Sequence, residues 1–383
     1  MPSGALTQLP FHALVTEALD TALAGPTALR QPEWLARRNA ITILPSVASL
    51  KALRTVAKPS QASKPYIGFG NPILDGPDAA FAEASKAARA RQHCGMALTS
   101  QTRSAMAIAG FIQPHHQSRA PAADHIRSQV PLPETADELC AVARDIGAGE
   151  DDVYLGDRNT EARIKSLSAN GDLAQHRIVH FATHGALAGE LRLGAEPGLV
   201  MTPPATGTEE DDGYLSASEV ANLKLDADLV ILSACNTAAG GADNAEALSG
   251  LARAFFYAGA RSLLVSHWAV NSEATVKLIS RLVGELKANP NIGRAEALRR
   301  SMVAMIDGGT DAEAHPSAWA PFILVGEGAA SAPAALGAPV AISPVAIAAP
   351  PSPSKTVARK GRSNRKAAPK ATTDDWRADA FRH

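Results

Sequence analysis

One histidine and one cysteine stand at points where an apolar run stops abruptly. His184 and Gly185 follow the run "RIVHFAT", and Cys235, which lies 51 residues after His184, ends the run "DLVILSA". A thiol with an ordinary pKa is mostly protonated at neutral pH, so a nucleophilic cysteine needs a base within hydrogen-bond distance. The pair therefore makes Cys235 a candidate nucleophile and His184 a candidate general base. On position alone, the favoured interpretation is that Cys235 ends a core strand and serves only packing.

The two runs can cooperate only if their strands are neighbours in one parallel sheet. Catalytic groups gather beyond the carboxyl ends of such strands, where both side chains would then emerge. Gly185 has no Cβ, so its N–H can approach a substrate carbonyl closely and form an oxyanion hole with the N–H of Cys235. Small residues around Cys235, Ser233 among them, would leave room for an extended peptide.

Other polar residues near these breaks are candidates for lining the substrate site. His180 lies four residues before His184 and is an alternative base or ligand, although packing is the favoured role. His267 ends another predicted strand and is interpreted as structural or substrate-lining. The remaining candidates are Ser233, Asn236 and Asp212. Asp212 lies in the acidic stretch 207–213, for which a solvated loop without a role at the site is the favoured interpretation. No ligand spacing such as CxxC or HExxH occurs, so we expect neither a metal nor a cofactor.

Apolar runs alternate with amphipathic segments along most of the chain. Strands are predicted at 40–45, 65–70, 152–156, 177–183, 228–234, 262–268 and 319–326, and helices at 135–147, 159–167, 215–223, 246–259, 272–287 and 293–306. The helix at 215–223 begins with a capping box from Ser216 to Glu219. Strands that are apolar on both faces and separated by helices predict an α/β fold with a mostly parallel sheet covered on both sides.

Composition is that of a soluble globular protein with 46% hydrophobic and 20% charged residues. The net charge of −1 gives no overall case for binding nucleic acid or a membrane. No apolar run is long enough to span a bilayer, and the N-terminus lacks the pattern of a signal peptide. The three cysteines, Cys94, Cys140 and Cys235, follow no pairing motif. We therefore expect no disulfide framework and a cytoplasmic, reducing location.

The last part of the chain, residues 329–383, differs from the rest. It is first rich in alanine and proline and then basic, with nine Lys or Arg and three Asp after residue 350. Such a composition predicts a disordered tail. A weak contact with nucleic acid through the basic stretch is the functional interpretation, and a solubilising tail is the favoured one.

Several of these stretches together resemble the CHAT-domain proteins, the caspase- and separase-like cysteine proteases of bacteria. The similar stretches are "RIVHFATHG", "DGYLSASEV", "LVILSACNTAAG", "GLARAFFYAGARSLLVSHWAV" and "HPSAWAPFILVGEG", with "ITILPSVASLKAL", "GFGNPIL" and "LPETADEL" further upstream. They occur in the family's order and cover roughly residues 1–328. The resemblance implies a caspase-hemoglobinase-like three-layer αβα sandwich in which His184 is the base and Cys235 the nucleophile. Their separation agrees with the caspase-like value of about 50 residues.

Three features depart from the family pattern. Relatives usually have a strand just before the stretch equivalent to "PSGALTQLPF", with which this chain begins, so we expect a domain truncated at its N-terminus or a start that lies upstream. Relatives often carry helical repeats before the domain, and none is present here. Ser233 stands where relatives that cleave after Lys or Arg often have Asp, so that position does not support a basic P1 preference.

The sequence therefore predicts a cysteine endopeptidase over residues 1–328. Its expected partner is a protein or peptide substrate, and a regulatory or activating protein is a second candidate partner. The alternative is a catalytically silent adaptor with the same fold, which binds a protein partner through its groove or C-terminal tail.

Overall fold

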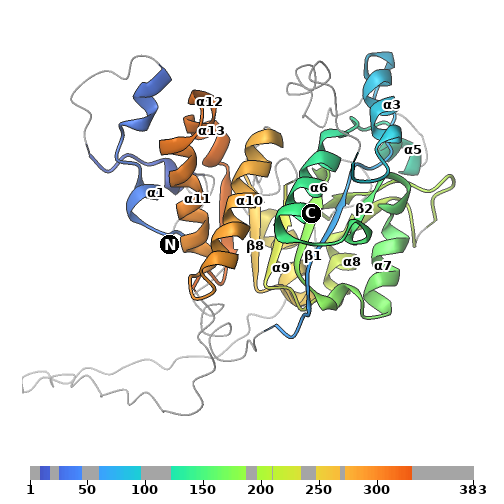
Figure 1. Cartoon of the computed structure of the whole chain (residues 1–383). Coiled ribbons are helices and arrows are strands. Elements are labelled where there is room, and N and C mark those ends of the chain that lie inside the picture. The colour runs from blue at the N-terminus through green and yellow to red at the C-terminus, as the bar shows by residue number, and fades with distance from the viewer. Residues whose placement is uncertain are drawn as a thin grey trace, which may run out of the picture. The chain divides into compact units, whose positions relative to one another are not determined.

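A six-stranded sheet organises the part of the chain that the structure describes (Figure 1). The structure, a computed structural model, describes residues 9–17, 26–44, 60–95, 122–186, 196–208, 210–233, 247–267 and 272–329. The strands of the sheet follow the order β2-β1-β3-β7-β8-β9. They are β1 (Lys64–Gly70), β2 (Val153–Leu155), β3 (His176–Ala182), β7 (Leu229–Leu232), β8 (Ser262–Ser266) and β9 (Phe322–Gly326).

Neighbouring strands run parallel throughout this sheet except at one edge, where β9 pairs with β8 in the antiparallel direction. A second, antiparallel sheet joins β4 (Gly185–Ala186), β5 (Gly198–Val200) and β6 (Tyr214–Ser216). The sequence did not predict these short strands.

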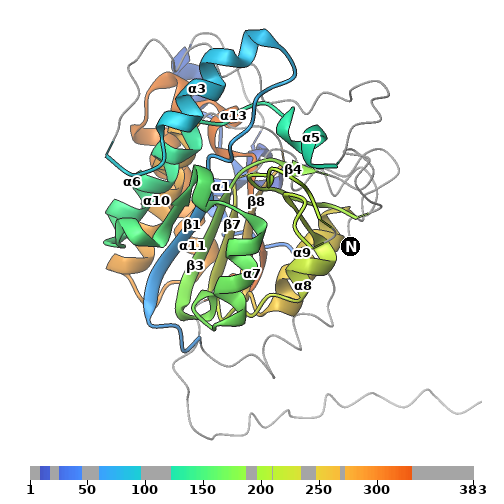
Figure 2. The ribbon, with the colours of Figure 1, turned by 90° about the vertical axis from the view of Figure 1, so that its right-hand side faces the viewer.

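Helices cover both faces of the main sheet (Figure 2). One face packs against α6 (Glu134–Ile146), α10 (Ser272–Ala288) and α11 (Arg294–Gly308). The other packs against α7 (Glu161–Ala169), α8 (Ala217–Ala221) and α9 (Ala247–Ala258). Shorter helices are α1 (Leu35–Arg38), α3 (Ala82–Ala90), α5 (Ala122–Arg127), α12 (Asp311–Ala314) and α13 (Pro316–Trp319). The predicted three-layer αβα fold with a mostly parallel sheet is confirmed.

Alternation along β3 explains the two hydrophobic cores. Ile178 and Ala182 belong to the core beneath α6, whereas Val179 and Phe181 belong to the core beneath α7 and α9. Successive side chains of a strand point to opposite faces, so a strand buried on both sides must be apolar at almost every position. The capping box predicted at Ser216 and Glu219 is formed and begins α8.

The strand predicted at residues 40–45 is wrong. In the described residues 40–44, the chain makes only an isolated bridge between Ile43 and Val325 of β9. The Thr42 hydroxyl donates toward the carbonyl oxygens of Leu324 and Gly326. The segment therefore lies along the outer edge of β9 and does not extend into a ladder.

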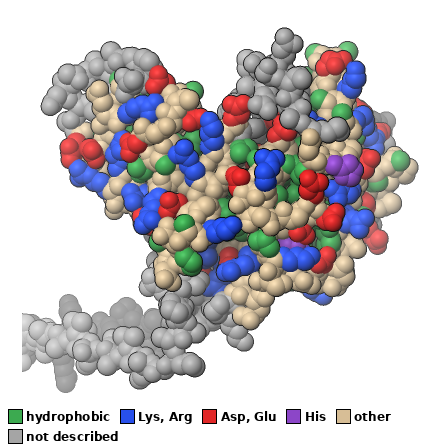
Figure 3. All heavy atoms as spheres, viewed as in Figure 1, with side chains coloured by type: hydrophobic (Ala, Val, Ile, Leu, Met, Phe, Trp, Pro, Cys, Tyr) green, Lys and Arg blue, Asp and Glu red, His purple; other side chains and the backbone are tan. Residues whose placement is uncertain are grey.

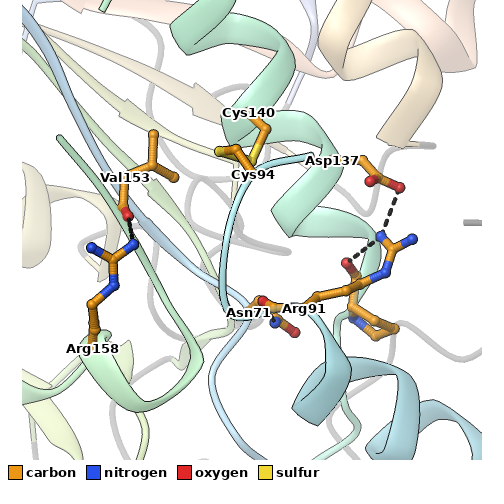
Figure 4. Close-up of a disulfide and its surroundings, with 8 residues drawn as sticks. Asn71, Arg91, Cys94, Asp137, Cys140, Val153 and Arg158 are labelled. Atoms are coloured by element: carbon orange, nitrogen blue, oxygen red, sulfur yellow. Dashed lines mark hydrogen bonds and ion pairs between the residues drawn. A yellow bond between two sulfur atoms is a disulfide. The ribbon is translucent and has the colours of Figure 1, made fainter. Parts of the chain in front are cut away.

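The expectation that the cysteines are unpaired is wrong for two of the three. Cys94 and Cys140 form a disulfide between residues 46 positions apart, with Cα atoms 5.5 Å apart (Figure 4). Beside it, Arg91 makes an ion pair with Asp137 (2.8 Å) and donates to the carbonyl oxygen of Pro133 (3.2 Å). The disulfide ties the chain after α3 to α6, a pairing that no local sequence motif reveals.

Charges of both signs are interspersed on the face shown in Figure 3. Within the described residues, no helix is long and apolar enough to cross a membrane. The predicted tail lies outside the described residues apart from Ala329, so its disorder and the domain boundary at residue 328 stay predictions.

Candidate active site

The ends of β3 and β7 meet at one edge of the main sheet. The two strands are parallel neighbours, with Phe181 opposite Leu232, and the N–H of Ser233 donates to the carbonyl oxygen of Phe181 (3.0 Å). The adjacency of the two strands that a His184–Cys235 pair requires is therefore present. Cys235 and Asn236 lie outside the described residues, so the distance from Cys235 Sγ to His184 stays a prediction.

His184 is held in one orientation two residues after the end of β3. Its side chain is 1% exposed, and its Nε2 lies 2.7 Å from the carbonyl oxygen of Val130. A carbonyl only accepts hydrogen bonds, so Nε2 carries the proton and Nδ1 carries the lone pair. Nδ1 is buried and has no hydrogen-bond partner among the described residues. Burial lowers the pKa of His184, which keeps the ring neutral at pH 7 and able to accept a proton at Nδ1.

Val130 is a site residue that the sequence analysis missed. It lies in the connection between α5 and α6, 54 residues before His184. Only its backbone carbonyl takes part, and every residue type supplies one. No side-chain motif could therefore have indicated this contact.

The backbone of His184 and Gly185 is fixed by the small antiparallel sheet. The N–H of Val200 donates to the carbonyl oxygen of His184 (2.9 Å), and Gly185 pairs with Leu199. The Thr183 hydroxyl donates to the carbonyl oxygen of Val200. This short sheet positions the chain that carries both the candidate base and the candidate oxyanion donor. The oxyanion role of Gly185 stays a prediction.

His180 lies deeper in β3 and contacts Ser233. Its Nε2 is 2.9 Å from Ser233 Oγ, and its Nδ1 is 3.0 Å from the Tyr66 hydroxyl. The ring is fully buried. Both of its nitrogens thus have hydrogen-bond partners, in contrast to those of His184. Ser233, predicted to line the substrate site, directs its hydroxyl toward this ring.

A family model described as "CHAT domain" matches residues 1–327. The chain belongs to the CHAT-domain family. The family expected from the resemblance is thereby confirmed.

Two curated relatives of this CHAT-domain chain are mammalian. Tetratricopeptide repeat protein 28 of Mus musculus is 29% identical in an alignment of 234 residues, and the match covers 51% of this chain and 9% of that protein. The Homo sapiens protein of the same name is 29% identical in an alignment of 227 residues, and the match covers 51% of this chain and 8% of that protein. The chain thus spans less than a tenth of the length of either relative. A bacterial source stays a prediction.

One solved structure similar to this CHAT-domain chain is the crystal structure of the Arg-specific cysteine proteinase gingipain R. It is 12% identical, with a TM-score of 0.31, and the match covers 51% of this chain and 42% of that chain. At that TM-score the likeness has no bearing on activity.

His267 directly follows β8 of the CHAT domain and is buried, with its N–H donating to the carbonyl oxygen of Pro321 (2.9 Å). It lies near His12, a residue that the sequence analysis did not single out. Burial, and after it the charge of His267, lowers the pKa of His12 to about 4. Burial also lowers the pKa of His267. Its predicted role in lining the substrate site remains untested.

Asp212 is part of a hydrogen-bonded loop. Its Oδ1 accepts from the N–H of Tyr214 (2.8 Å), and its own N–H donates to Glu161 Oε2 (3.1 Å). Glu161 pairs with Lys165, which also reaches Glu219 (2.7 Å). Burial raises the pKa of Asp212. These contacts give Asp212 a structural role in its loop, and its substrate-lining role stays a prediction.

Among the described residues, no group of three or more His, Cys, Asp or Glu side chains is arranged to hold a metal ion.

Proposed function

We propose that this CHAT-domain protein is a cysteine endopeptidase in which His184 activates Cys235. The observation that carries the proposal is the state of His184. It is buried, its Nε2–H is held by Val130, and the lone pair of its Nδ1 has no partner among the described residues. A general base must accept a proton at a ring nitrogen whose lone pair is available, which sets His184 apart from His180, whose two ring nitrogens both have hydrogen-bond partners.

The proposed reaction begins with proton transfer from the Cys235 thiol to His184 Nδ1. The thiolate attacks the carbonyl carbon of a peptide bond, and the carbonyl oxygen becomes an oxyanion. The N–H groups of Gly185 and Cys235 stabilise that oxyanion. As the intermediate collapses, the C–N bond breaks and His184 returns its proton to the leaving amine. The product is an acyl-enzyme on Cys235.

Water completes the cycle. His184, neutral again, accepts a proton from a water molecule as the water oxygen attacks the thioester carbon. The C–S bond then breaks, and the Cys235 sulfur recovers the proton from His184. Throughout, the Val130 carbonyl holds Nε2–H and stabilises the imidazolium, so that Nδ1 is the atom that exchanges protons.

Substrate and compartment belong to the same proposal. We expect a protein or peptide substrate, and a regulatory protein as a second kind of partner. The cytoplasmic location expected from unpaired cysteines loses that support, because Cys94 and Cys140 form a disulfide and disulfides persist mainly in oxidising compartments.

Cleavage of an unbiased peptide library by the purified protein tests the proposal. His184→Ala and Cys235→Ala should each lower kcat/KM by several orders of magnitude, and the double variant should be little worse, because residues that act as a unit are strongly non-additive. Ser262→Ala is the matched control, since it removes a buried hydroxyl bound to the Asp228 carbonyl oxygen at the other end of the sheet. Full activity in His184→Ala would overturn the assignment.

The adaptor alternative gives a different result in the same experiment. A folded protein that cleaves no peptide, and whose Cys235 reacts with a thiol-directed probe no faster than an unfolded chain, would favour the adaptor.

A further inference from the structure

A cluster of polar side chains lies inside the sheet beneath the candidate active site. Tyr66 of β1, Glu138 of α6 and His180 of β3 are each 2% exposed or less. Ser233, at the end of β7, is half-buried. Four separate elements therefore contribute to one buried group of hydrogen-bonding side chains, here called the His180 cluster.

One tautomer of His180 fits its neighbours in the cluster. Burial, and after it the charge of Glu138, raises the pKa of Tyr66 well above its usual value, so Tyr66 keeps its proton. The Tyr66 hydroxyl can then donate to Nδ1 of His180, 3.0 Å away. With Nδ1 accepting, Nε2 carries the ring proton and donates to Ser233 Oγ at 2.9 Å.

Glu138 reinforces this orientation of the ring. Its Oε1 lies 3.1 Å from His180 Nε2, within ion-pair distance but without the alignment of a hydrogen bond. The Tyr66 and His180 rings also pack edge to face, with centroids 6.0 Å apart. The position of the imidazole is therefore fixed from β1 and from α6, and Nε2–H points at Ser233.

Packing alone does not account for such a cluster. Well-packed apolar side chains of similar volume fill a core with equal or greater stability, because polar groups lose their hydration when they are buried. The cluster instead fixes one particular atom, the Ser233 hydroxyl, at the end of β7. Cys235 is two residues further along the chain, so its Cα lies within about 7 Å of the Cα of Ser233.

We propose that His180 is a positioning residue for Cys235: with Tyr66 and Glu138 it fixes Ser233 and thereby the end of the strand from which the nucleophile follows. This inference rests on the proposed function. Its role differs from that of His184, since His180 contacts neither the thiol nor the substrate in this scheme. It acts only through the backbone that leads from Ser233 to Cys235.

The test measures how fast iodoacetamide alkylates Cys235 in the folded protein without reductant, with the site mapped by mass spectrometry. Because Cys94 and Cys140 form a disulfide, Cys235 is the remaining thiol of the three. Each rate is divided by the rate for the same variant unfolded in urea. This ratio reports activation of the thiol by the fold.

Ser233→Ala and Tyr66→Phe each remove one hydroxyl from the cluster. Misplacing a reacting group by an ångström can cost on the order of a hundredfold in rate, so we expect each to lower the ratio by about tenfold. Ser233→Thr keeps the hydroxyl and should retain most of the ratio. Ser262→Ala, a matched loss of a buried hydroxyl, should leave it unchanged.

His184→Ala separates failure of the inference from failure of the proposed function. If His184→Ala lowers the ratio while Ser233→Ala and Tyr66→Phe behave like Ser262→Ala, the positioning role is wrong and the dyad stands. If His184→Ala has no effect, the thiol is not activated by His184, and both proposals fall. A rate ratio that falls in Ser233→Ala and is just as low in Ser233→Thr would also refute the positioning role.

Discussion

Removing the disulfide should destabilise the CHAT domain measurably. In the double variant Cys94→Ser/Cys140→Ser, the unfolded chain regains the freedom of a loop whose ends are 46 residues apart. The chain-entropy relation gives about 4 kcal/mol at 25 °C for a loop of that length. For a folded domain of roughly 300 residues, this corresponds to a fall in Tm of about 6 °C.

Local contacts in the folded state limit any further loss of stability. Arg91 is almost fully buried and still joins the two segments through Asp137 and the Pro133 carbonyl oxygen after the sulfurs are gone. These contacts keep the ends of the loop together in the folded state, so the free energy of unfolding does not fall further through local opening of the two segments. A measured loss of about 2 to 4 kcal/mol would agree with the structure.

Urea unfolding followed by circular dichroism, with and without a phosphine reductant, provides the assay. Reductant should lower the stability of the wild type to that of the double variant and should leave the double variant unchanged. Cys235→Ser is the control and should respond to reductant like the wild type. If reductant shifts the wild-type midpoint no more than that of the double variant, Cys94 and Cys140 are not paired.

Three further predictions concern pH, a glycine and the tail. Burial raises the pKa of Glu134 to about 7. Between about pH 4.5 and 7 the folded state therefore binds more protons than the unfolded state, and the free energy of unfolding should fall by up to about 3 kcal/mol as the pH rises through that window. Glu134→Gln should remove this fall, as urea titrations at several pH values would show. Gly259→Ala should cost more than about 2 kcal/mol, since Gly259 has φ +113° and an added Cβ would lie 2.1 Å from the Leu225 carbonyl oxygen; a Tm equal to that of Gly284→Ala, where nothing lies within 4 Å, would contradict this. Deleting residues 329–383 should leave Tm nearly unchanged, and a drop of several degrees in a thermal melt would show that the tail packs.

The main sheet could be predicted because its strands are buried on both faces. Residues 65–70, 177–183 and 262–268 are mostly apolar and are separated by amphipathic helices, which favours buried strands paired in parallel. Strands β4 to β6 have two or three residues each, too few for any periodicity. The segment at 40–45 was predicted as a strand from its apolar run, but only Ile43 pairs with β9.

The candidate site was predictable only where a side chain marks it. His184 stands out because it breaks an apolar run, whereas the Val130 carbonyl that orients it has no sequence signal. His180 was interpreted mainly as a packing residue, and its partners come from β1, α6 and β7, which are distant in sequence. The pairing of Cys94 with Cys140 is likewise a property of the fold, because it depends on the chain after α3 meeting α6.

The contact between residues 40–44 and β9 has a consequence for solubility. Ile43 donates its N–H to Leu324 and accepts from the N–H of Gly326, so it occupies main-chain groups on the outer edge of an apolar strand. An uncovered edge of this kind is a template on which another chain can add a strand. Residues 40–44 thus cover the outer edge of β9 within the same chain. A chain shortened to begin at residue 60 should therefore self-associate through β9, even though its predicted catalytic residues are intact.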